Sequence, residues 1–311
     1  MRAIFLVMPS NLRSQALATL PPRAGVSPSY VWLPNGPWKT IADFFIFRFP
    51  HVNLASWESR MSRGEVRDEH SVSLHLDSLY RAGACVFYYR EPEEETPIPF
   101  QAEIIYQDDE ILIADKPHFL PVTPGGRFLH ETLLVRLKNK TGITNLVPLH
   151  RLDRETAGLV MFSVNLNTRH QWLSLFKERT VKKIYEAHAG FNEQLPLPHV
   201  HRSRLVQDEQ FFKMKEVDGE PNSETIIHLH KRELSHTSYL LEAITGKMHQ
   251  LRVHMMALGL PLLNDALYPI THAANSDDFT APLKLLARSV AFKNPINGNH
   301  YFFESRRSLY D

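Results

Sequence analysis

Hydrophobic and polar residues follow distinct patterns along the first part of the chain. Apolar side chains recur three and four positions apart over residues 41–49, which predicts an amphipathic helix. A second short helix is expected around Trp57–Met61, ending at Gly64. Polar and apolar residues alternate over 72–76, and Val86–Tyr89 is an apolar run, so each predicts a strand. Together these elements predict a small α+β module.

An acidic segment with several prolines follows this module and is the best linker candidate. Residues 91–99 hold four glutamates and three prolines. Residues 1–35 are rich in Pro, Ser and Arg and show little periodicity, which predicts an irregular arm. We therefore expect an N-terminal domain over residues 1–95 and a second domain over residues 96–311.

Strand patterns outnumber helix patterns after residue 100. Short apolar runs at 104–106 and 111–114 flank an acidic turn, which predicts a hairpin. Further strands are expected at 159–162, 181–187, 226–230 and 239–244, and helices at 131–140, 165–176 and 248–258. Because regular strand–helix alternation is absent, we predict an α+β fold with a mixed, mostly antiparallel sheet.

The expected helix over 165–176 has a defined buried face. Leu166, Leu173 and Phe176 share one side at helical spacing and are expected to pack on the sheet. One of the two asparagines at its start, at position 165 or 167, is the expected N-cap.

Composition places the chain among globular proteins that bury a core. It has 311 residues, of which 43% are hydrophobic and 22% charged, and a formal net charge of +1. The single cysteine, Cys85, excludes an intramolecular disulfide and a Cys-rich zinc site, so we expect a reducing, cytoplasmic location. No apolar run approaches the roughly 20 residues of a membrane helix, and Ala3–Met8 is too short for a signal peptide.

Charge is sorted along the chain although its total is nearly zero. Residues 91–110 hold eight acids and no lysine or arginine, whereas residues 127–185 hold eleven bases and four acids. A basic stretch of this length can face a polyanion such as a nucleic acid, or it can form a solvated surface. Charge alone does not decide between these interpretations.

Common cofactor and metal motifs are absent or incomplete. The chain has no GxGxxG and no GxSxG motif, and a phosphate-binding loop ending at Thr245–Lys247 would lack its first glycine. Two His-x-His pairs, His199 with His201 and His228 with His230, each offer two ligands on one strand face, but a metal site needs a third. We expect no metal; a metal hydrolase is the alternative.

The sharpest concentration of chemistry lies in the middle of the chain. Asp153 stands among His150, Arg151 and Arg154, and Gly158 closes the turn before an apolar run. Nearby positive charge lowers a carboxyl pKa, so an ionised Asp153 suits a nucleophile or an electrostatic stabiliser. From the spacing alone, an ion-paired turn that ties a loop to the sheet is equally consistent.

Several motifs in this half of the chain resemble one known family. His150–Gly158, with the pattern HRLDxxTAG, is similar to the HRLDxxTSG signature of the RluA-type pseudouridine synthases. Further segments are similar to family motifs and follow in the same order: Asp115–Pro117 with Pro124–Gly125, Lys183–Tyr185, Thr245–His254 and Pro261–Tyr268. The chain departs from the pattern at Ala157, where the family has Ser, and at Leu286, where it has His.

The resemblance covers about residues 100–311 and implies both fold and activity. It implies the pseudouridine synthase fold with an RNA cleft, and isomerisation of uridine to pseudouridine. Residues 41–66 resemble the S4 RNA-binding domain often fused to this family, which would place Arg60 and Arg63 on the helix that meets RNA phosphate. Arg67–Glu69 replaces the usual VNG of that domain, and a structural cap is the alternative role.

Pseudouridine formation needs no cofactor, because it breaks the N1–C1′ bond of uridine and joins C5 to C1′ without gain or loss of atoms. An ionised carboxylate beside C1′ can stabilise the positive charge that develops there, or attack that carbon, as in glycosidases. Asp153 is the expected group, and the resemblance points to the same residue. Arg252 is expected to clamp Asp153 bidentately, and Tyr185 to stack on the uracil ring.

The expected partner is RNA, either ribosomal or transfer RNA, and the chain is expected to be a monomer. The target base must leave its stack, so Arg154 is a candidate to fill the vacated space. Other RNA contacts are expected from His150, Arg151, Arg179, Lys182 and Lys183. The alternative function is a catalytically silent RNA-binding or assembly factor that retains the fold.

Overall fold

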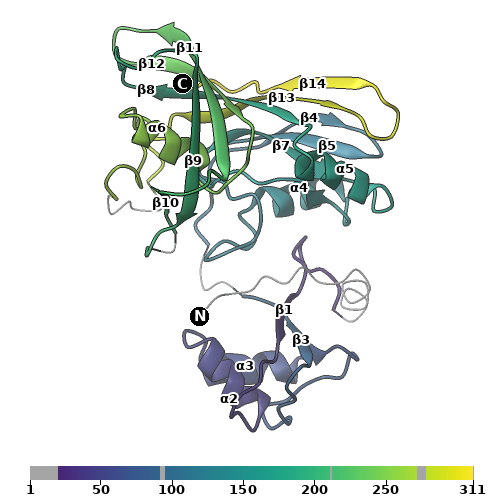
Figure 1. The fold of residues 1–311 in the computed structure, drawn as a ribbon. Helices are drawn as coiled ribbons and strands as arrows, with labels where there is room; N and C mark the ends of the chain where they lie inside the picture. Colours follow the sequence, from purple (N-terminus) through teal and green to yellow (C-terminus); the bar gives the residue numbers. More distant parts are fainter. Residues whose placement is uncertain (1–19, 92–94, 211, 272–277, 311) are drawn as a thin grey trace. The chain divides into compact units, whose positions relative to one another are not determined.

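The computed structural model describes residues 20–91, 95–210, 212–271 and 278–310 (Figure 1). The chain divides into two compact units, Met1–Glu95 and Thr96–Asp311. Most of the expected N-terminal arm, the stretch Ala3–Met8 included, and residues 92–94 of the expected linker lie outside the described residues. Within the described ranges, no helix is both long and apolar enough to cross a lipid bilayer.

The N-terminal unit packs two helices against a small sheet. The helices are α2 (Ile41–Arg48) and α3 (Leu54–Ser62); β1 (Ser29–Trp32), β2 (Val66–Asp68) and β3 (Cys85–Tyr88) pair antiparallel in the order β1-β3-β2. Aromatic side chains fill its core. The rings of Phe45 and Trp57 have centroids 4.4 Å apart, and both are almost fully buried.

Local signals explain where these helices begin and end. At the start of α2, the Thr40 hydroxyl accepts from the Asp43 N–H, and the Asp43 carboxylate accepts from the Thr40 N–H. The Asn53 side chain caps α3 by accepting from the Ser56 N–H at 2.8 Å. Gly64, at φ +68°, lets the chain turn sharply after α3.

The prediction of a strand at residues 72–76 is wrong, because no strand forms between β2 and β3. Asp68 accepts hydrogen bonds from the N–H groups of His70 and Val72 at 2.9 Å each, so a side chain closes a turn here. Leu74 and Leu76 pack against the core of the unit, but the segment forms only an isolated bridge, between Ser73 and Arg67, and no strand. Their alternation therefore reflects the burial of a loop.

The second unit is built on one large mixed sheet. Its strands pair in the order β10-β9-β11-β12-β8-β13-β7-β5-β4, with β14 beside β13 and β6 beside β7. Only β13 and β7 run parallel among the described strand pairs, so the predicted α+β fold with a mostly antiparallel sheet is confirmed. The strands are β4 (Glu103–Gln107), β5 (Ile111–Lys116), β6 (Val147–Pro148), β7 (Ala157–Ser163), β8 (Lys182–Ala189), β9 (His199–Gln207), β10 (Met214–Val217), β11 (Ser223–Arg232), β12 (Thr237–Ala243), β13 (Leu285–Lys293) and β14 (His300–Glu304).

Helices cover both faces of the sheet at β5 and β7 (Figure 1). On β7, Val160 belongs to the cluster that includes α4 (Leu133–Thr141), whereas its neighbour Leu159 packs with α5 (Arg169–Lys177). Successive side chains of a strand point to opposite faces, so a strand covered on both sides must be apolar throughout. Residues 159–162 of β7 are therefore all apolar because both faces of the strand are covered.

Helix α5 differs from its prediction in both its start and its buried face. Thr168 is the N-cap, so both asparagines proposed as caps lie in the preceding turn. The side chain that α5 buries is Trp172, whereas Leu166 and Leu173 are 59% and 42% exposed. Phe176, the third residue of the predicted face, is half-buried and packs on the same core cluster as Trp172. The helical spacing was counted from Leu166, which lies before the helix, so the predicted face is right only at Phe176.

Helix α6 (Gln250–Ala257) packs against β9, β10 and β11, the strands at one end of the sheet (Figure 1). Leu251 and Met255, four positions apart on one side of the helix, join the core cluster of the sheet. Gly259, at φ +74°, ends the helix. The first six residues of α6 are all buried, so any charged side chain there needs a partner inside the protein.

Candidate active site

Asp153 lies on the loop that joins β6 to β7. The Thr156 N–H donates to the Asp153 carbonyl at 3.2 Å and closes the turn. The buried Lys116 ammonium, at the end of β5, donates to the Arg154 carbonyl at 3.1 Å and to the carbonyls of Pro117 and Leu120. Burial lowers the Lys116 pKa to about 7, although the charges of Glu155 and Asp153 oppose this shift. Lys116 therefore fixes the peptide that follows Asp153.

Gly158 sets where this loop enters the sheet. Its φ is +109°, and a Cβ built on it would lie 2.3 Å from the carbonyl oxygen of Ala287. Ala287 is its partner across the parallel junction of β7 and β13. Only a residue without a side chain permits this approach, which explains the glycine that ends the motif.

Arg252 reaches Asp153 from α6, but a second carboxylate holds it. Its Nη1 lies 3.4 Å from Asp153 Oδ2. Its Nε and Nη2 donate to the two carboxylate oxygens of Asp265 at 2.8 and 2.7 Å. The predicted bidentate clamp on Asp153 is therefore wrong: Asp265 takes the fork of the guanidinium and leaves one N–H for Asp153.

Burial separates the roles of the two carboxylates. The side chains of Arg252 and Asp265 are 1% and 0% exposed, whereas that of Asp153 is 25% exposed. Burial by itself lowers the Arg252 pKa, but hydrogen bonding and charge from Asp265 outweigh it and raise that pKa above its ordinary value. Arg252 is a fixed buried cation, and Asp153 is the carboxylate of this trio that reaches solvent.

His249 adds a ring beside the same carboxylate. It precedes α6 with φ +53°, a left-handed conformation that is uncommon outside glycine. Its Nε2 lies 3.9 Å from Asp153 Oδ1, and its Nδ1 lies 2.9 Å from the Tyr268 hydroxyl. Burial lowers the His249 pKa, although the Asp153 charge opposes this, so the ring is neutral near pH 7.

A pocket of about 90 Å³ lies at the Asp153 carboxylate. Tyr185 reaches it from β8; burial, and next the charge of Asp153, raise the Tyr185 pKa, so the phenol is neutral. Thus the structure brings Asp153, Arg252 and Tyr185 together. The other lining residues come from the β6–β7 loop, the end of β12, the start of α6 and β13: Arg151, Leu152, Thr156, Ala243, Thr245, Gly246, Lys247, His249, Gln250, Leu251 and Leu285.

Residues expected to contact RNA differ in their surroundings. Arg151 is exposed and lines the pocket. Lys183 extends from β8 to the pocket wall, where its Nζ would lie 3.7 Å from a Cβ built on Gly246. Lys182 and Arg179 are exposed on the surface near the start of β8. These four cations lie on or beside the segments that frame the pocket.

His150 and Arg154, by contrast, make contacts inside the protein. His150 Nε2 accepts from the Met161 N–H at 3.1 Å, and its ring stacks on Phe176. Arg154 Nε donates to the Phe119 carbonyl at 3.0 Å. Neither side chain lines the pocket. This arrangement gives both residues packing roles, and it lends no support to Arg154 as the group that fills a vacated base stack.

Arg60 and Arg63, in the N-terminal unit, are held by acidic side chains. Arg60 is 6% exposed and donates to Glu91 at 3.2 Å. Arg63 donates to Glu65 at 2.8 Å and to Glu91 at 3.0 Å, and these partners, with Glu65 the stronger, raise its pKa. Both guanidinium groups expected to meet RNA phosphate thus have carboxylate partners within the unit.

Known proteins share this sequence pattern. Residues 110–257 match the family model described as RNA pseudouridylate synthase. An uncharacterized RNA pseudouridine synthase of Synechocystis is 29% identical over 73% of this chain and 78% of its own length. The dual-specificity RNA pseudouridine synthase RluA of Pasteurella multocida is 32% identical over 62% of this chain and 88% of its own length. The chain belongs to the RluA-type family of RNA pseudouridine synthases.

As an RNA pseudouridine synthase the chain is an isomerase with an RNA substrate. The solved structure of human RNA pseudouridylate synthase domain containing 1 shares its fold, with a TM-score of 0.56 and 21% identity over 69% of this chain and 86% of that one. The predicted family and fold are confirmed. Membership also favours the enzyme over the silent RNA-binding factor and the metal hydrolase. The S4-like interpretation of residues 1–95 is not confirmed by these matches.

Sequence reasoning assigned no role to three residues of the pseudouridine synthase site. Asp265 and Tyr268 stand in the segment Pro261–Tyr268, and His249 stands in Thr245–His254, so both motifs were visible. The family motifs could have drawn attention to these three residues. Motifs show which positions matter, but they do not show which side chains touch. That Asp265 holds Arg252, and Tyr268 holds His249, follows only from the folded loop after α6.

Proposed function

We propose that this pseudouridine synthase uses the Asp153 carboxylate at C1′ of a uridine turned out of a structured RNA. One observation carries the proposal: Asp153 is the acidic residue that lines the pocket, and a buried guanidinium lies 3.4 Å from it. The guanidinium places a fixed positive charge beside this carboxylate. The partial exposure of Asp153 gives a nucleotide access to it.

The proposed reaction moves one glycosidic bond. The N1–C1′ bond breaks with its electron pair on N1, and Asp153 captures or stabilises the electron-deficient C1′. The freed ring turns, and C5 forms the new bond to C1′. C5 then loses its proton and N1 gains one, so atoms and charge balance. No oxidant, reductant or co-reactant enters this sequence.

The surrounding side chains would orient the two partners of this reaction. Arg252, fixed by Asp265, presents one N–H to Asp153 and sets the direction of its carboxylate. The neutral ring of Tyr185 offers a face on which uracil can stack while it turns. Arg151 and Lys183 supply positive charge at the pocket, where the phosphates flanking the flipped nucleotide would lie.

We propose residues 96–311 as the catalytic domain, because every residue that lines the pocket lies within them. Residues 1–95 are proposed as an accessory module with an S4-like α+β arrangement. If that module binds RNA through Arg60 and Arg63, phosphate must compete with Glu65 and Glu91 for them. A cap on the catalytic domain requires no such exchange.

The proposed substrate is ribosomal or transfer RNA, and the dual-specificity name of the Pasteurella relative is compatible with either. The test maps pseudouridine across total RNA from cells with and without the gene, then restores wild-type protein or Asp153→Asn. We expect one or a few positions in these RNAs to lose pseudouridine and only wild-type protein to restore them. Restoration by Asp153→Asn would overturn the aspartate proposal, and an unchanged map would overturn the substrate proposal.

A further inference from the structure

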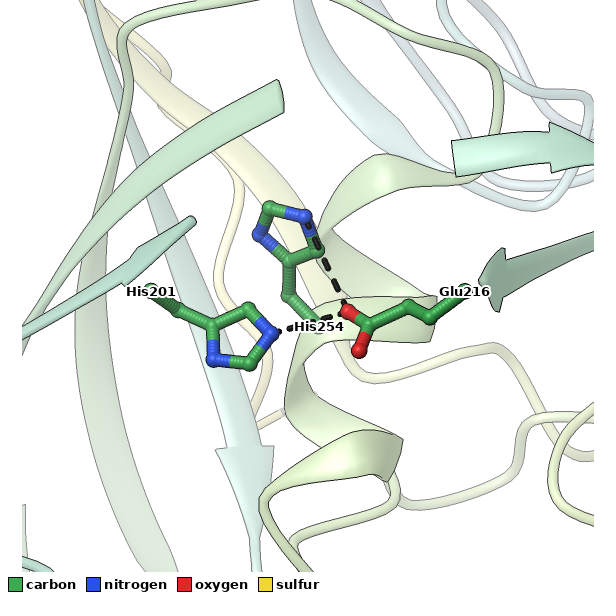
Figure 2. A group of neighbouring side chains, drawn as sticks. All are labelled: His201, Glu216 and His254. Carbon is green, nitrogen blue, oxygen red and sulfur yellow. Dashed lines mark hydrogen bonds and ion pairs between the residues drawn. The ribbon is translucent and has the colours of Figure 1, made fainter. Parts of the chain in front are cut away.

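Three side chains that could bind a metal converge at one end of the large sheet, outside the pocket. His201 comes from β9, Glu216 from β10 and His254 from α6, and Figure 2 shows the three side chains close together, with His201 directed at the Glu216 carboxylate. None of the three lines the Asp153 pocket. They take no part in the proposed isomerisation of uridine.

The distances fit one small cation with modest adjustment. His201 Nε2 lies 2.8 Å and His254 Nε2 lies 4.0 Å from Glu216 Oε1, and the possible ligand atoms all lie within 4.8 Å of one another. Tetrahedral zinc with nitrogen and oxygen ligands at about 2.0–2.1 Å places neighbouring ligand atoms about 3.4 Å apart. The two measured separations bracket that value.

The surroundings of His254 suit a neutral metal ligand. The ring is completely buried, and its Nδ1 lies 2.9 Å from the Thr225 hydroxyl. Metal-bound histidines commonly donate their second N–H to such an outer partner, which fixes the ring and its tautomer. The His254 Nε2 atom hydrogen-bonds the hydroxyls of Ser203 and Ser223 at 3.1 and 3.0 Å, and the ion would replace these bonds.

We propose that His201, Glu216 and His254 bind one divalent transition-metal ion of the Zn²⁺ type. Two imidazole nitrogens and one carboxylate oxygen are ligands that zinc accepts, and they leave a fourth position for water. His201 and Glu216 are 16% and 26% exposed, so an ion can enter from solvent. Binding replaces the direct contact between His201 Nε2 and Glu216 Oε1 with bonds from both atoms to the ion.

The ion would add a link between α6 and the strands against which it already packs. β10 is the outermost strand and pairs only with β9 among the described strands. The far half of β9 leaves β11 and pairs with β10 instead. A metal held by β9, β10 and α6 would fasten this hairpin to the helix that carries Arg252. The proposed role is structural.

The pattern of histidines in the sequence did not predict this group. The His-x-His pairs suggested that neighbours on one strand act together, and no metal was expected. In the structure His199 is not part of the group, and the two ligands that join His201 come from other elements. The fold therefore supplies two ligands, Glu216 and His254, that no spacing along the sequence could reveal.

The test measures zinc binding by the full chain, with any affinity tag removed and metal stripped by a chelator. Wild-type protein is compared with His201→Gln and Glu216→Gln, and with His199→Gln as the matched control on the same strand. Zinc is titrated against a chromophoric competitor. Co²⁺ added to wild-type protein reports four-coordinate geometry through its visible absorption.

We expect one Zn²⁺ per wild-type chain, a rise in Tm on binding, and an intense Co²⁺ spectrum. Each ligand variant should lose at least tenfold in affinity, whereas His199→Gln should bind as wild type does. Equal zinc binding by wild type and both ligand variants, or a Co²⁺ spectrum of hexa-aqua type, would overturn the proposal. The Co²⁺ readout needs no variant, so it remains decisive if a variant fails to fold. Neither readout depends on RNA isomerisation.

Discussion

At the scale of single residues, Asp265 fixes the position of Arg252 more than Asp153 does. A guanidinium buried to 1% exposure needs full compensation, and Asp265 provides it through two short bonds. The longer 3.4 Å contact leaves Asp153 partly free to meet a substrate. The trio thus separates the residue that holds the cation from the residue that we propose reacts.

Replacing Asp265 tests this separation. Asp265→Ala leaves a buried cation without its main partner and should cost about 3–5 kcal/mol of unfolding free energy, measured by urea denaturation. Asp265→Asn keeps the acceptor for the N–H groups of Leu267 and Tyr268 and should stay folded. Its turnover should fall at least tenfold with little change in RNA affinity. Wild-type turnover in the Asn variant would contradict the positioning role.

Gly158 gives a second residue-scale prediction. Gly158→Ala places a Cβ against the Ala287 carbonyl at a positive φ, and strain with overpacking should cost about 2–4 kcal/mol. Gly142→Ala, at φ +73° in open space, should cost about 1 kcal/mol. Gly190→Ala, in open space without a positive φ, should be nearly neutral. Equal unfolding free energies for all three variants would show that the short distance between Gly158 and the Ala287 carbonyl does not determine the residue at this position.

The sequence predicted which residues lie together at the pocket better than it predicted the residues that support them. Asp153, Arg252 and Tyr185 could be named because their chemistry is distinctive and the family motifs mark them. Asp265 could not be assigned, because a carboxylate near a tyrosine has many possible partners until the loop is folded. The bidentate clamp was placed on the wrong carboxylate for the same reason.

At the scale of elements, hydrophobic patterns worked for helices with one apolar side and for strands with a continuous apolar run, and they failed where burial is mixed. The helices over 41–49 and 248–258 and the strands β5 and β7 were predicted from such patterns. β9 alternates between more and less exposed positions, yet its less exposed side begins with two histidines and a serine before it reaches Leu205. Hydrophobic alternation could therefore not reveal it.

The buried face of α5 can be tested directly. Trp172→Ala removes a fully buried indole, which also donates to Glu110 at 3.3 Å, and should cost about 3–5 kcal/mol. Leu173→Ala removes a side chain that is 42% exposed and should cost under about 1 kcal/mol. Chemical unfolding of both variants measures the difference. A larger loss from Leu173→Ala would restore the face predicted from spacing.

At the scale of the whole molecule, buried histidines couple stability to pH. Burial lowers the His118 pKa to about 4 and the His150 pKa to about 3. Both lie below the ordinary value near 6.5, so the unfolded chain takes up protons first as pH falls. The stability from these neutral rings is present above pH 6.5 and is lost as pH falls towards 4.

Between pH 7 and pH 5, each of these histidines should lower the unfolding free energy by about 1–2 kcal/mol. Guanidinium unfolding at the two pH values measures this loss in wild-type protein. A variant with His118→Gln and His150→Gln should show a clearly smaller difference between pH 7 and pH 5. An identical pH dependence in both proteins would show that these rings are already protonated when folded, or accessible to solvent.

The central claim is that one carboxylate, that of Asp153, performs the isomerisation. Single-turnover release of tritium from RNA labelled at uracil C5, with enzyme in excess over the mapped substrate, tests it most directly. Asp153→Asn should bind the RNA within about threefold of wild type and release no tritium above background, because C5 keeps its proton unless C1′ has changed partners. Tritium release by this variant at a rate within tenfold of wild type would contradict the account.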